Sequence, residues 1–466
     1  MKRLVKYSTI LVLGLLPPAA YAGDITAPAA VKPAGTAVLV AGGAGNQVDP
    51  HVSGTLVAYT AQPEGRIHYV DLADKSDNTI PGPPGTWDAL PDVSGNTIVF
   101  RHGYDDNVSV ICAYDVTSKT TVALDPPADP QPYVYRVNPR IGGRTVVWQE
   151  RFPDSTYDDI VAFDLDTNVV TRLTNDDGYS RWPSVSPDGS TVVWTKLIGA
   201  SDNQLWQATH NPDGTWTTKQ LTTSAAVYSQ PDTNGEVVLY SVYSPLPEGG
   251  YENALCLQPV GGGAETRIVL SGVKSYYKVS RHLIVFTRWT WTVSEDVYAY
   301  DYDTNTLYQI TDTPERGERL DDVSVDADGT ARVVWNDGTS GELDVLAFTF
   351  HLGHNYSVQP LFDQARSYKV GGVVPIRVQL LDAQGNNVSS SDILLSATGL
   401  VPVGGATPSD VVDAGNSNPD SNFRYDATLA GYVFNLSTKD LAAGAWELRF
   451  MAGPDASPYS IRFNLR

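Results

Sequence analysis

Residues 182–194 read Trp182-Pro183-Ser184-Val185-Ser186-Pro187-Asp188-Gly189-Ser190-Thr191-Val192-Val193-Trp194. A Pro and a polar residue lead into a Val-Ser turn, and a β-branched pair that ends in an aromatic follows. The same order returns as Leu90-Pro91-Asp92-Val93-Ser94-Gly95 and then Ile98-Val99-Phe100. Turn residues flanked by β-branched and aromatic runs are typical of two strands joined by a hairpin.

Seven copies of this pattern lie between Val48 and Trp335. Pro opens five of the copies, and Tyr or Asp replaces it in the last two. These positions are Pro50, Pro91, Pro139, Pro183, Pro231, Tyr277 and Asp321. Their spacings are 41, 48, 44, 48, 46 and 44 residues. A period of about 40–50 residues with four strands per unit predicts a β-propeller.

The two ends of the repeat region complement each other. Residues 36–40 match the fourth strand of the third repeat, but no first three strands precede them. The last repeat has strands at 323–325, 331–335 and 343–350 and no fourth strand. We expect the N-terminal strand to complete the last sheet, which covers an otherwise open edge. The sequence therefore predicts an all-β, seven-bladed β-propeller over residues 36–352.

The N-terminus has the features of an export signal. Lys2, Arg3 and Lys6 precede an apolar run at 8–16, and Ala20-Tyr21-Ala22 forms a small-residue cleavage site. The run is too short to span a membrane. We expect a signal peptide over residues 1–22, cleavage after Ala22, and a secreted or periplasmic protein. Residues 23–35, rich in Ala and Pro, are predicted to form a linker.

Acidic residues outnumber basic ones by 53 to 32, and removal of the predicted leader leaves a net charge of −24. Such a surface repels phosphate backbones, which argues against a nucleic-acid partner. We expect a monomer without a membrane span. Cys112 and Cys256 fall in third strands three blades apart, too far for a disulfide, and are predicted to be buried free thiols.

An aromatic residue ends the second strand of every repeat. These residues are Tyr59, Phe100, Trp148, Trp194, Tyr240, Phe286 and Trp335. Large side chains at one fixed strand position fill the space between neighbouring sheets, at about 1.5–3 kcal/mol each. The sequence predicts packing for this set rather than a binding surface.

The Ser186-Pro187-Asp188-Gly189 turn follows a repeat that closes with Thr171-Arg172-Leu173-Thr174, and Leu221-Thr222 and Ile310-Thr311 repeat that closing signature. These motifs resemble the TolB-type propeller family over roughly residues 36–352. The resemblance implies the fold and no single activity, because this fold hosts binding modules, peptidase companion domains and polysaccharide lyases.

Past about Asn355 the period stops. Short alternating runs separated by Gly- and Asn-rich turns predict a β-sandwich. The segments Tyr368-Lys369-Val370-Gly371 and Gly431-Tyr432-Val433-Phe434-Asn435 resemble an Ig-like module found at the ends of bacterial exported proteins. This resemblance implies an accessory Ig-like β-sandwich over residues 356–466.

Aromatic residues and Arg are frequent in the loops that lead from a fourth strand into the next first strand. They include Trp87, Tyr135, Tyr179, Arg181, Trp182, Tyr228 and Tyr276. Sugar rings stack on aromatic faces, and Arg or carboxylates bind hydroxyl and uronate groups. Two interpretations stay open, a glycan-binding platform and rings that cover the ends of the blades.

The residue after each Pro position also recurs in register, and its charge varies from repeat to repeat. These residues are His51, Asp92, Arg140, Ser184, Asp232, Lys278 and Asp322. We expect them near the mouth of the central channel. As a site, Asp232, Asp322 and His51 would hold a cation or act as a base, and Arg140 or Lys278 would bind an acidic group. As structure, they would form ion pairs in a water-filled channel.

Third strands lead into polar turns such as Asp164-Leu165-Asp166-Thr167-Asn168. The spacing resembles half of a calcium loop but lacks its Gly and distal Glu. Asp and Asn also favour tight turns by themselves. The sequence predicts no cofactor, with calcium as the alternative.

Two functions remain open. The first is an exported binding protein that recognises an extracellular glycan or protein through the aromatic-rich face. Its expected ligand-binding residues are Trp87, Asp92, Tyr135, Trp182, Tyr228, Asp232, Tyr276, Lys278 and Asp322. The alternative is a polysaccharide lyase, in which a Tyr or His removes the proton α to a uronate carboxylate that an Arg neutralises. Its candidates are His51, Arg140, Tyr179 and Arg181. No G-x-S-x-G motif of a serine hydrolase occurs. Without a convergent acid/base set, the sequence favours binding.

Overall fold

The computed structural model describes residues 23–466 except 34, 36, 105–107, 126–134, 153–154, 176–177, 199–201, 224–226, 246–250, 270–272, 290–294, 314–316, 340–341, 355, 383–384, 404–410, 413, 415–417, 419–420, 454 and 456–457. The described regular structure is strand, with no α-helix, and most sheets have four strands. This arrangement is typical of a β-propeller and confirms the predicted all-β propeller fold.

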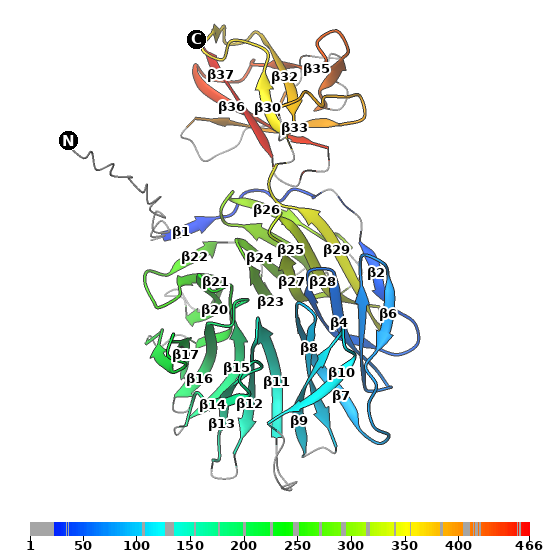
Figure 1. Ribbon diagram of the computed structural model, residues 1–466. Helices are drawn as coiled ribbons and strands as arrows, with labels where there is room; N and C mark the ends of the chain where they lie inside the picture. The colour runs from blue at the N-terminus through cyan, green and yellow to red at the C-terminus, as the bar shows by residue number, and fades with distance from the viewer. Residues whose placement is uncertain are drawn as a thin grey trace, which may run out of the picture.

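In each blade, meaning each four-stranded propeller sheet, consecutive strands pair antiparallel (Figure 1). The first four along the chain contain β3 (Gln47–Ser53), β4 (Leu56–Ala61), β5 (Arg66–Asp71) and β6 (Ser76–Thr79); β7 (Trp87–Ser94), β8 (Thr97–Gly103), β9 (Ser109–Asp115) and β10 (Thr120–Leu124); β11 (Tyr135–Gly142), β12 (Thr145–Arg151), β13 (Asp158–Asp164) and β14 (Val169–Arg172); and β15 (Tyr179–Val185), β16 (Thr191–Ile198), β17 (Asp202–His210) and β18 (Trp216–Gln220).

Two further units share this strand order. They contain β19 (Val227–Thr233), β20 (Val237–Pro245), β21 (Tyr251–Pro259) and β22 (Thr266–Val269); and β23 (Val273–Ser280), β24 (Leu283–Trp289), β25 (Glu295–Asp301) and β26 (Thr306–Gln309). The last propeller strands are β27 (Gly317–Val325), β28 (Thr330–Thr339) and β29 (Glu342–His351).

The N-terminal strand completes the β27–β29 unit, as the sequence predicts. Strand β2 (Val38–Ala41) pairs antiparallel with β29, in the register Val38↔Ala347 and Leu39↔Leu346. It occupies the outermost place in this unit, where Val40 and Ala41 pack on a core cluster that includes Val345. The first described strands therefore close the sheet formed by the last propeller strands.

The segment before β2 is more ordered than a linker. Residues 23–26 form β1 (Gly23–Thr26), a fifth strand that runs parallel to β22. Val31 then bridges to Tyr308, and its amide donates to the Leu307 carbonyl at 2.8 Å. The N-terminal segment thus follows the outer edges of three successive units, ending in β2. The sequence predicts only a linker here, because four-residue edge strands without alternation give no periodic signal.

The aromatic residue at the end of each second strand is buried. Trp148, Trp194, Tyr240 and Phe286 are 0% exposed, and Tyr59, the most accessible of the set, is 3% exposed. Trp148 lies in a cluster with Val99 and Ile111 of the preceding blade. Packing between sheets, as predicted, is the role of this set. Both cysteines are also buried and free.

Two more four-stranded sheets follow the propeller and enclose one core. One contains β30 (Ser357–Pro360), β32 (Val373–Leu381), β35 (Gly431–Ser437) and β34 (Arg424–Asp426); the other contains β31 (Ser367–Tyr368), β37 (Tyr459–Leu465), β36 (Gly444–Ala452) and β33 (Leu395–Pro402). Alternate residues of β32 and β36, such as Ile376 and Leu448, point into that core. Figure 1 shows these sheets above the propeller.

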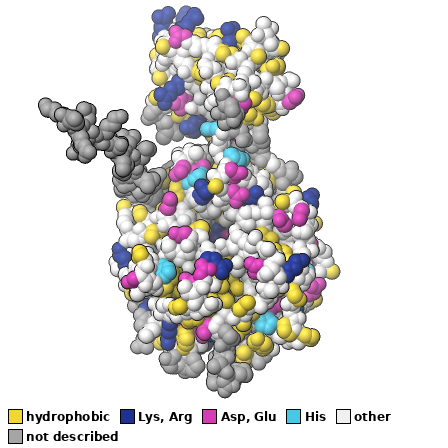
Figure 2. Space-filling model, viewed as in Figure 1, with side chains coloured by type: hydrophobic (Ala, Val, Ile, Leu, Met, Phe, Trp, Pro, Cys, Tyr) yellow, Lys and Arg dark blue, Asp and Glu magenta, His cyan; other side chains and the backbone are white. Residues whose placement is uncertain are grey.

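Acidic and basic side chains are interspersed over the propeller face in Figure 2. Among the described residues, no helix has the length and apolar character that crossing a membrane requires.

Candidate functional site

The seven residues that follow the Pro positions converge on one cavity. The cavity has a volume of about 710 Å³, and its walls include every member of the set. A second cavity of about 180 Å³ lies on the other side of His51, Arg140, Ser184, Asp232 and Lys278, which line both. These side chains therefore form a constriction that divides the central channel, and we call the seven residues the channel ring.

A repeated β-bulge points these side chains into the channel. Six of the seven first strands lose register with the second strand immediately before the ring residue, as between Val48 and His51 or between Ala89 and Asp92; in β23 the shift falls one residue earlier, between Ser275 and Tyr277. In the first six repeats the residue before the Pro position has a positive φ, for example 53° at Asp49. A bulge interrupts the alternation of side chains and re-aims the residue that follows.

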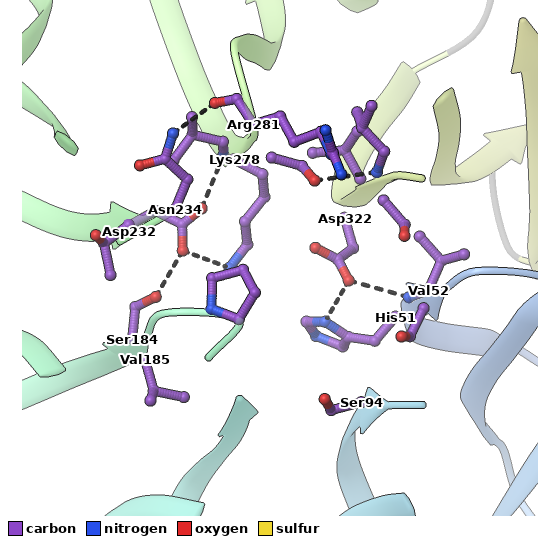
Figure 3. A pocket seen from close by; sticks show the side chains of 18 of the residues that line it. His51, Val52, Ser94, Ser184, Val185, Asp232, Asn234, Lys278, Arg281 and Asp322 are labelled. Atoms are coloured by element: carbon purple, nitrogen blue, oxygen red, sulfur yellow. Dashed lines mark hydrogen bonds and ion pairs between the residues drawn. The ribbon is translucent and has the colours of Figure 1, made fainter. Parts of the chain in front are cut away.

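His51 lies between two carboxylates. Its Nδ1 is 3.2 Å from Asp92 Oδ1 and 3.2 Å from Asp322 Oδ2. His51 is 5% exposed. Figure 3 shows His51 and Asp322 on one wall of the channel, across from Ser184, Asp232 and Lys278.

Arg140 contacts the other nitrogen of the same imidazole. Its Nη1 is 3.0 Å from His51 Nε2. Because a guanidinium only donates hydrogen bonds, Nε2 must be the acceptor, and the single proton of a neutral imidazole must then sit on Nδ1, facing the two carboxylates. Among the described residues, no carboxylate lies within ion-pair distance of Arg140.

The opposite wall is a second polar cluster. Ser184 Oγ donates to Asp232 Oδ1 at 2.7 Å, and Lys278 Nζ lies 3.7 Å from the same oxygen. These contacts agree with the expectation of ion pairs within the ring. The same cluster leaves Lys278 facing both cavities.

The three ring aspartates also join neighbouring blades. Asp322 Oδ2 accepts from the Val52 amide at 3.0 Å, Asp92 Oδ2 from Ile141 at 2.8 Å, and Asp232 Oδ2 from Val279 at 2.8 Å. Burial is the largest influence on the pKa of Asp322 and raises it, but a charged His51, Lys278 and the Val52 amide together hold that pKa below its usual range.

Serines of the Val-Ser turns form a second set of bonds between blades. Gly95 donates its amide to Ser53 Oγ at 3.0 Å, and Gly54 donates to Ser324 Oγ at 3.1 Å. Both glycines have a φ of 55°, a conformation that glycine adopts without strain. The Ser-Gly pair recurs because the serine accepts a hydrogen bond from the next unit and the glycine permits the turn that donates one. The bond between Gly54 and Ser324 links the first unit to the last.

His51, Asp92 and Asp322 also have the composition of a cation site. One ligand atom from each lies within 4.8 Å of the other two. A metal at Nδ1 would need that nitrogen without its proton, whereas the Arg140 contact requires the proton there. The set therefore does not fit a resident cation while Arg140 keeps its present position.

The smaller cavity contains a buried carboxyl that the repeat pattern places where other repeats have Pro. Asp321 lines this cavity with Asp49, Tyr276 and Arg319. Within the described part of the chain, its Oδ2 is buried without a hydrogen-bond partner. Burial raises the pKa of Asp321 to about 8; Arg319 opposes this shift and Asp49 adds to it.

Asp321→Asn should stabilise the protein at pH 8 and change little at pH 4. In the folded protein Asp321 keeps its proton up to about pH 8, whereas the unfolded chain loses it near pH 4. The folded state thus binds more protons between these values, so this group makes stability fall as pH rises. We expect a gain of about 1–3 kcal/mol in the free energy of unfolding at pH 8. Urea unfolding at several pH values measures the free energy of unfolding. Asp166→Asn, on an exposed turn, is the control. An unchanged pH dependence of stability in Asp321→Asn would contradict the raised pKa of Asp321.

Most aromatic residues expected at the platform stack on Arg instead. Arg101 lies over Trp87 at 4.6 Å and over Tyr135 at 5.2 Å from the ring centroids. Arg181 lies 5.7 Å from Tyr179 and 5.0 Å from Trp182. These pairs favour the interpretation that the rings cover the blade ends.

Trp182 and Tyr276 differ from the other rings because they also line the smaller cavity. Tyr276 is 37% exposed, and the guanidinium of Arg319 lies 4.1 Å from the centroid of its ring. The side chain of Tyr228 lies outside the described residues. Of the platform set, two described rings thus border the channel.

The structure brings together half of the lyase candidates. His51 and Arg140 are in contact across the ring. Tyr179 packs edge-on against Tyr157 at 4.8 Å, with Arg181 beside it, and neither lines the two cavities. The polar turns after third strands use their carboxylates locally: Asp164 Oδ1 accepts from the amides of Asp166 and Thr167 at 2.8 and 2.9 Å.

Arg281 is a cavity residue that the repeat pattern did not single out. It lines the larger cavity with a φ of 48°, at the position where Gly54 and Gly95 stand in other repeats. A positive φ is uncommon for a residue other than glycine, and the backbone strain costs of order 1–3 kcal/mol of stability. Such strained residues cluster at functional sites, which makes Arg281 a candidate site residue. The sequence does contain a signal for this residue, because Ser280-Arg281 stands where other repeats have Ser-Gly.

Comparisons with known proteins assign neither a family nor a function. No family model and no curated protein matches the sequence. Similar solved structures include the β-propeller domain of the Trilobed protease from Pyrococcus furiosus, with 16% identity over 66% of this chain and 98% of that chain and a TM-score of 0.48. An oligogalacturonate lyase in complex with manganese has 13% identity over 63% of this chain and 86% of that chain, with a TM-score of 0.48. A putative TolB from Agrobacterium tumefaciens has 19% identity over 48% of this chain and 80% of that chain, with a TM-score of 0.36. The function must therefore be argued from the channel itself.

Proposed function

We propose that this chain is an exported binding protein that takes a carboxylate-bearing glycan into the central channel of its propeller. Arg140 is the observation that carries the proposal. It is a half-buried guanidinium that borders both cavities and contacts only the neutral imidazole of His51 among its ring neighbours. A guanidinium fork matches a carboxylate with two parallel hydrogen bonds.

The rest of the channel suits a polyhydroxylated ligand. Ser184, Asn234 and the ring aspartates offer both donors and acceptors to hydroxyl groups. Trp182 and Tyr276 offer ring faces in the smaller cavity, where sugar C–H groups can stack. The larger cavity, about 710 Å³, falls within the usual range for ligand pockets. The channel, rather than the outer aromatic face, is therefore the site we propose.

The same proposal includes the finer architecture. The four-stranded units are seven blades of a closed ring over residues 36–352, and residues 356–466 form an Ig-like β-sandwich that spaces or anchors the propeller. Residues 1–22 are a signal peptide, so that Gly23, the first residue of β1, starts the mature protein. We expect a secreted or periplasmic monomer.

Arg140→Gln should weaken binding of trigalacturonate about 10–100-fold, because a hydrogen-bonded charge pair is worth roughly 1.5–3 kcal/mol. Calorimetric titration of the mature protein measures the affinity. Arg144→Gln is the matched control, since Arg144 is exposed in the same blade and pairs with Asp166. Equal affinities for both variants, or no binding to any member of a panel of carboxylated glycans, would contradict the proposal.

A lyase is the second candidate, and the His51–Arg140 contact is what favours it. Arg140 would neutralise the uronate carboxylate, and His51 Nε2, once released from Arg140, would accept the α-proton. Elimination would break the bond between the β-carbon and the glycosidic oxygen, which leaves and takes a proton from solvent, and would create a double bond conjugated to the carboxylate. Ultraviolet absorbance should then grow when the protein meets polygalacturonate, and a flat trace with retained binding leaves the binding function alone.

A further inference from the structure

The contact between Arg140 and His51 exists only while His51 is neutral. A protonated imidazole carries N–H groups on both nitrogens and has no acceptor left. At 3.0 Å, Arg140 Nη1 and a protonated Nε2 would also place two positive charges in direct contact. Protonation of His51 must therefore expel Arg140 from its present position.

We infer that His51 is a proton-operated latch on Arg140. In the neutral state His51 holds Arg140 through Nε2; when Nε2 gains a proton, Arg140 turns away and becomes free to bind an anionic ligand in the channel. This inference rests on the proposed function, since it concerns how the same site binds a carboxylate. It makes His51 a positioning residue, which acts through Arg140.

Two carboxylates face the imidazole on the side away from Arg140. Asp92 and Asp322 both lie 3.2 Å from Nδ1, so a protonated ring would pair with two carboxylates at once. The released Arg140 would leave a cation-free space at Nε2, which removes the one contact that opposes the proton.

Other titratable groups face this region from both sides. Lys278 and Asp232 lie across the channel, where they pair with each other at 3.7 Å. On the far side of the constriction, Asp49 and Asp321 line the smaller cavity with Arg319. Of these, Asp321 has a pKa of about 8, so its ionisation adds a negative charge near the upper end of the neutral range.

Linkage gives the inference its measurable form. If the proton frees Arg140 for the ligand, the ligand must equally favour the proton. Affinity for an anionic glycan should rise as pH falls from 8 to 5, the range in which histidine changes charge, by up to about tenfold per pH unit. Binding should take up about one proton per site in the middle of that range.

Titration calorimetry with trigalacturonate, in buffers of different ionisation enthalpy, counts the protons taken up. We expect about one proton for the parent protein near neutral pH. His51→Gln should bind with no proton uptake and a flat pH profile, because the amide oxygen can accept from Arg140 but cannot be charged. Asp321→Asn removes the other group that titrates in the range and should keep the uptake.

The outcomes separate this inference from the function on which it rests. Absence of any binding between pH 5 and 8 contradicts the proposed function. Binding that depends on Arg140 but takes up no proton overturns the latch and leaves the function standing. Loss of the uptake in Asp321→Asn, with retention in His51→Gln, also overturns it, since the proton would then belong to the smaller cavity.

Discussion

Trp148→Ala should lower the free energy of unfolding of the propeller by about 3–5 kcal/mol, the range for truncating a large buried aromatic. The indole is 0% exposed and packs with Val99 and Ile111 from the preceding blade and Phe163 from its own. Its removal leaves a cavity between two sheets that rigid strands cannot close. Both blades therefore lose packing contacts at their interface.

A polar network adds to that cost. Trp148 Nε1 donates to Glu150 Oε2 at 2.8 Å, and Arg136 lies 5.5 Å from the ring and 2.9 Å from the same carboxylate. Truncation leaves a buried carboxylate oxygen with one donor fewer. Urea unfolding followed by tryptophan fluorescence and by circular dichroism measures the change, with the sandwich transition analysed separately.

Tyr104→Ala is the matched control, because Tyr104 follows the second strand of the neighbouring blade but is 53% exposed. It should change stability by less than about 0.5 kcal/mol. Equal losses for the two variants would contradict the view that the repeated aromatic holds adjacent blades together.

A chain that starts at Gly42 should fail to form a stable propeller, because it lacks β2. The edge of β29 would then expose its backbone N–H and C=O groups, and Val345 and Ala347 would lose the cover of Val40 and Ala41. We expect the melting temperature of the propeller to fall by roughly 10 °C or more, with association of exposed edges on size-exclusion chromatography.

A second truncation isolates the strand from the rest of the N-terminal segment. A chain that starts at Lys32 loses β1 and the Val31 bridge but keeps β2. It should remain monomeric with a smaller loss of stability. If both truncations behave alike, the pairing of β2 with β29 is not what stabilises the propeller.

Local sequence was enough to predict the repeat geometry. Every first strand has a bulge at or next to the repeat's Pro position, so residues as different as His51 and Lys278 reach the same channel. The buried aromatics followed from the same alignment. Strand β2 was predictable because its partner repeat lacked a strand.

Contacts across the channel could not be predicted in this way. Arg140 and His51 are 89 residues apart and belong to different blades, so their contact depends on how far two side chains reach across the ring. The stacking of Arg101 on Trp87 joins β8 to the first residue of β7, and no repeat position encodes it. Strand β1 gave no signal because its pairing partner β22 is far along the chain.

The position of the N-terminal segment sets an order on assembly. Residues 23–41 precede every other propeller strand in the chain, yet their partners β22, β26 and β29 come much later. During synthesis from the N-terminus, β2 has no partner until the residues of β29 up to His351 have been added. The sheet that contains β27–β29 can therefore be completed only after nearly all of the propeller sequence is available.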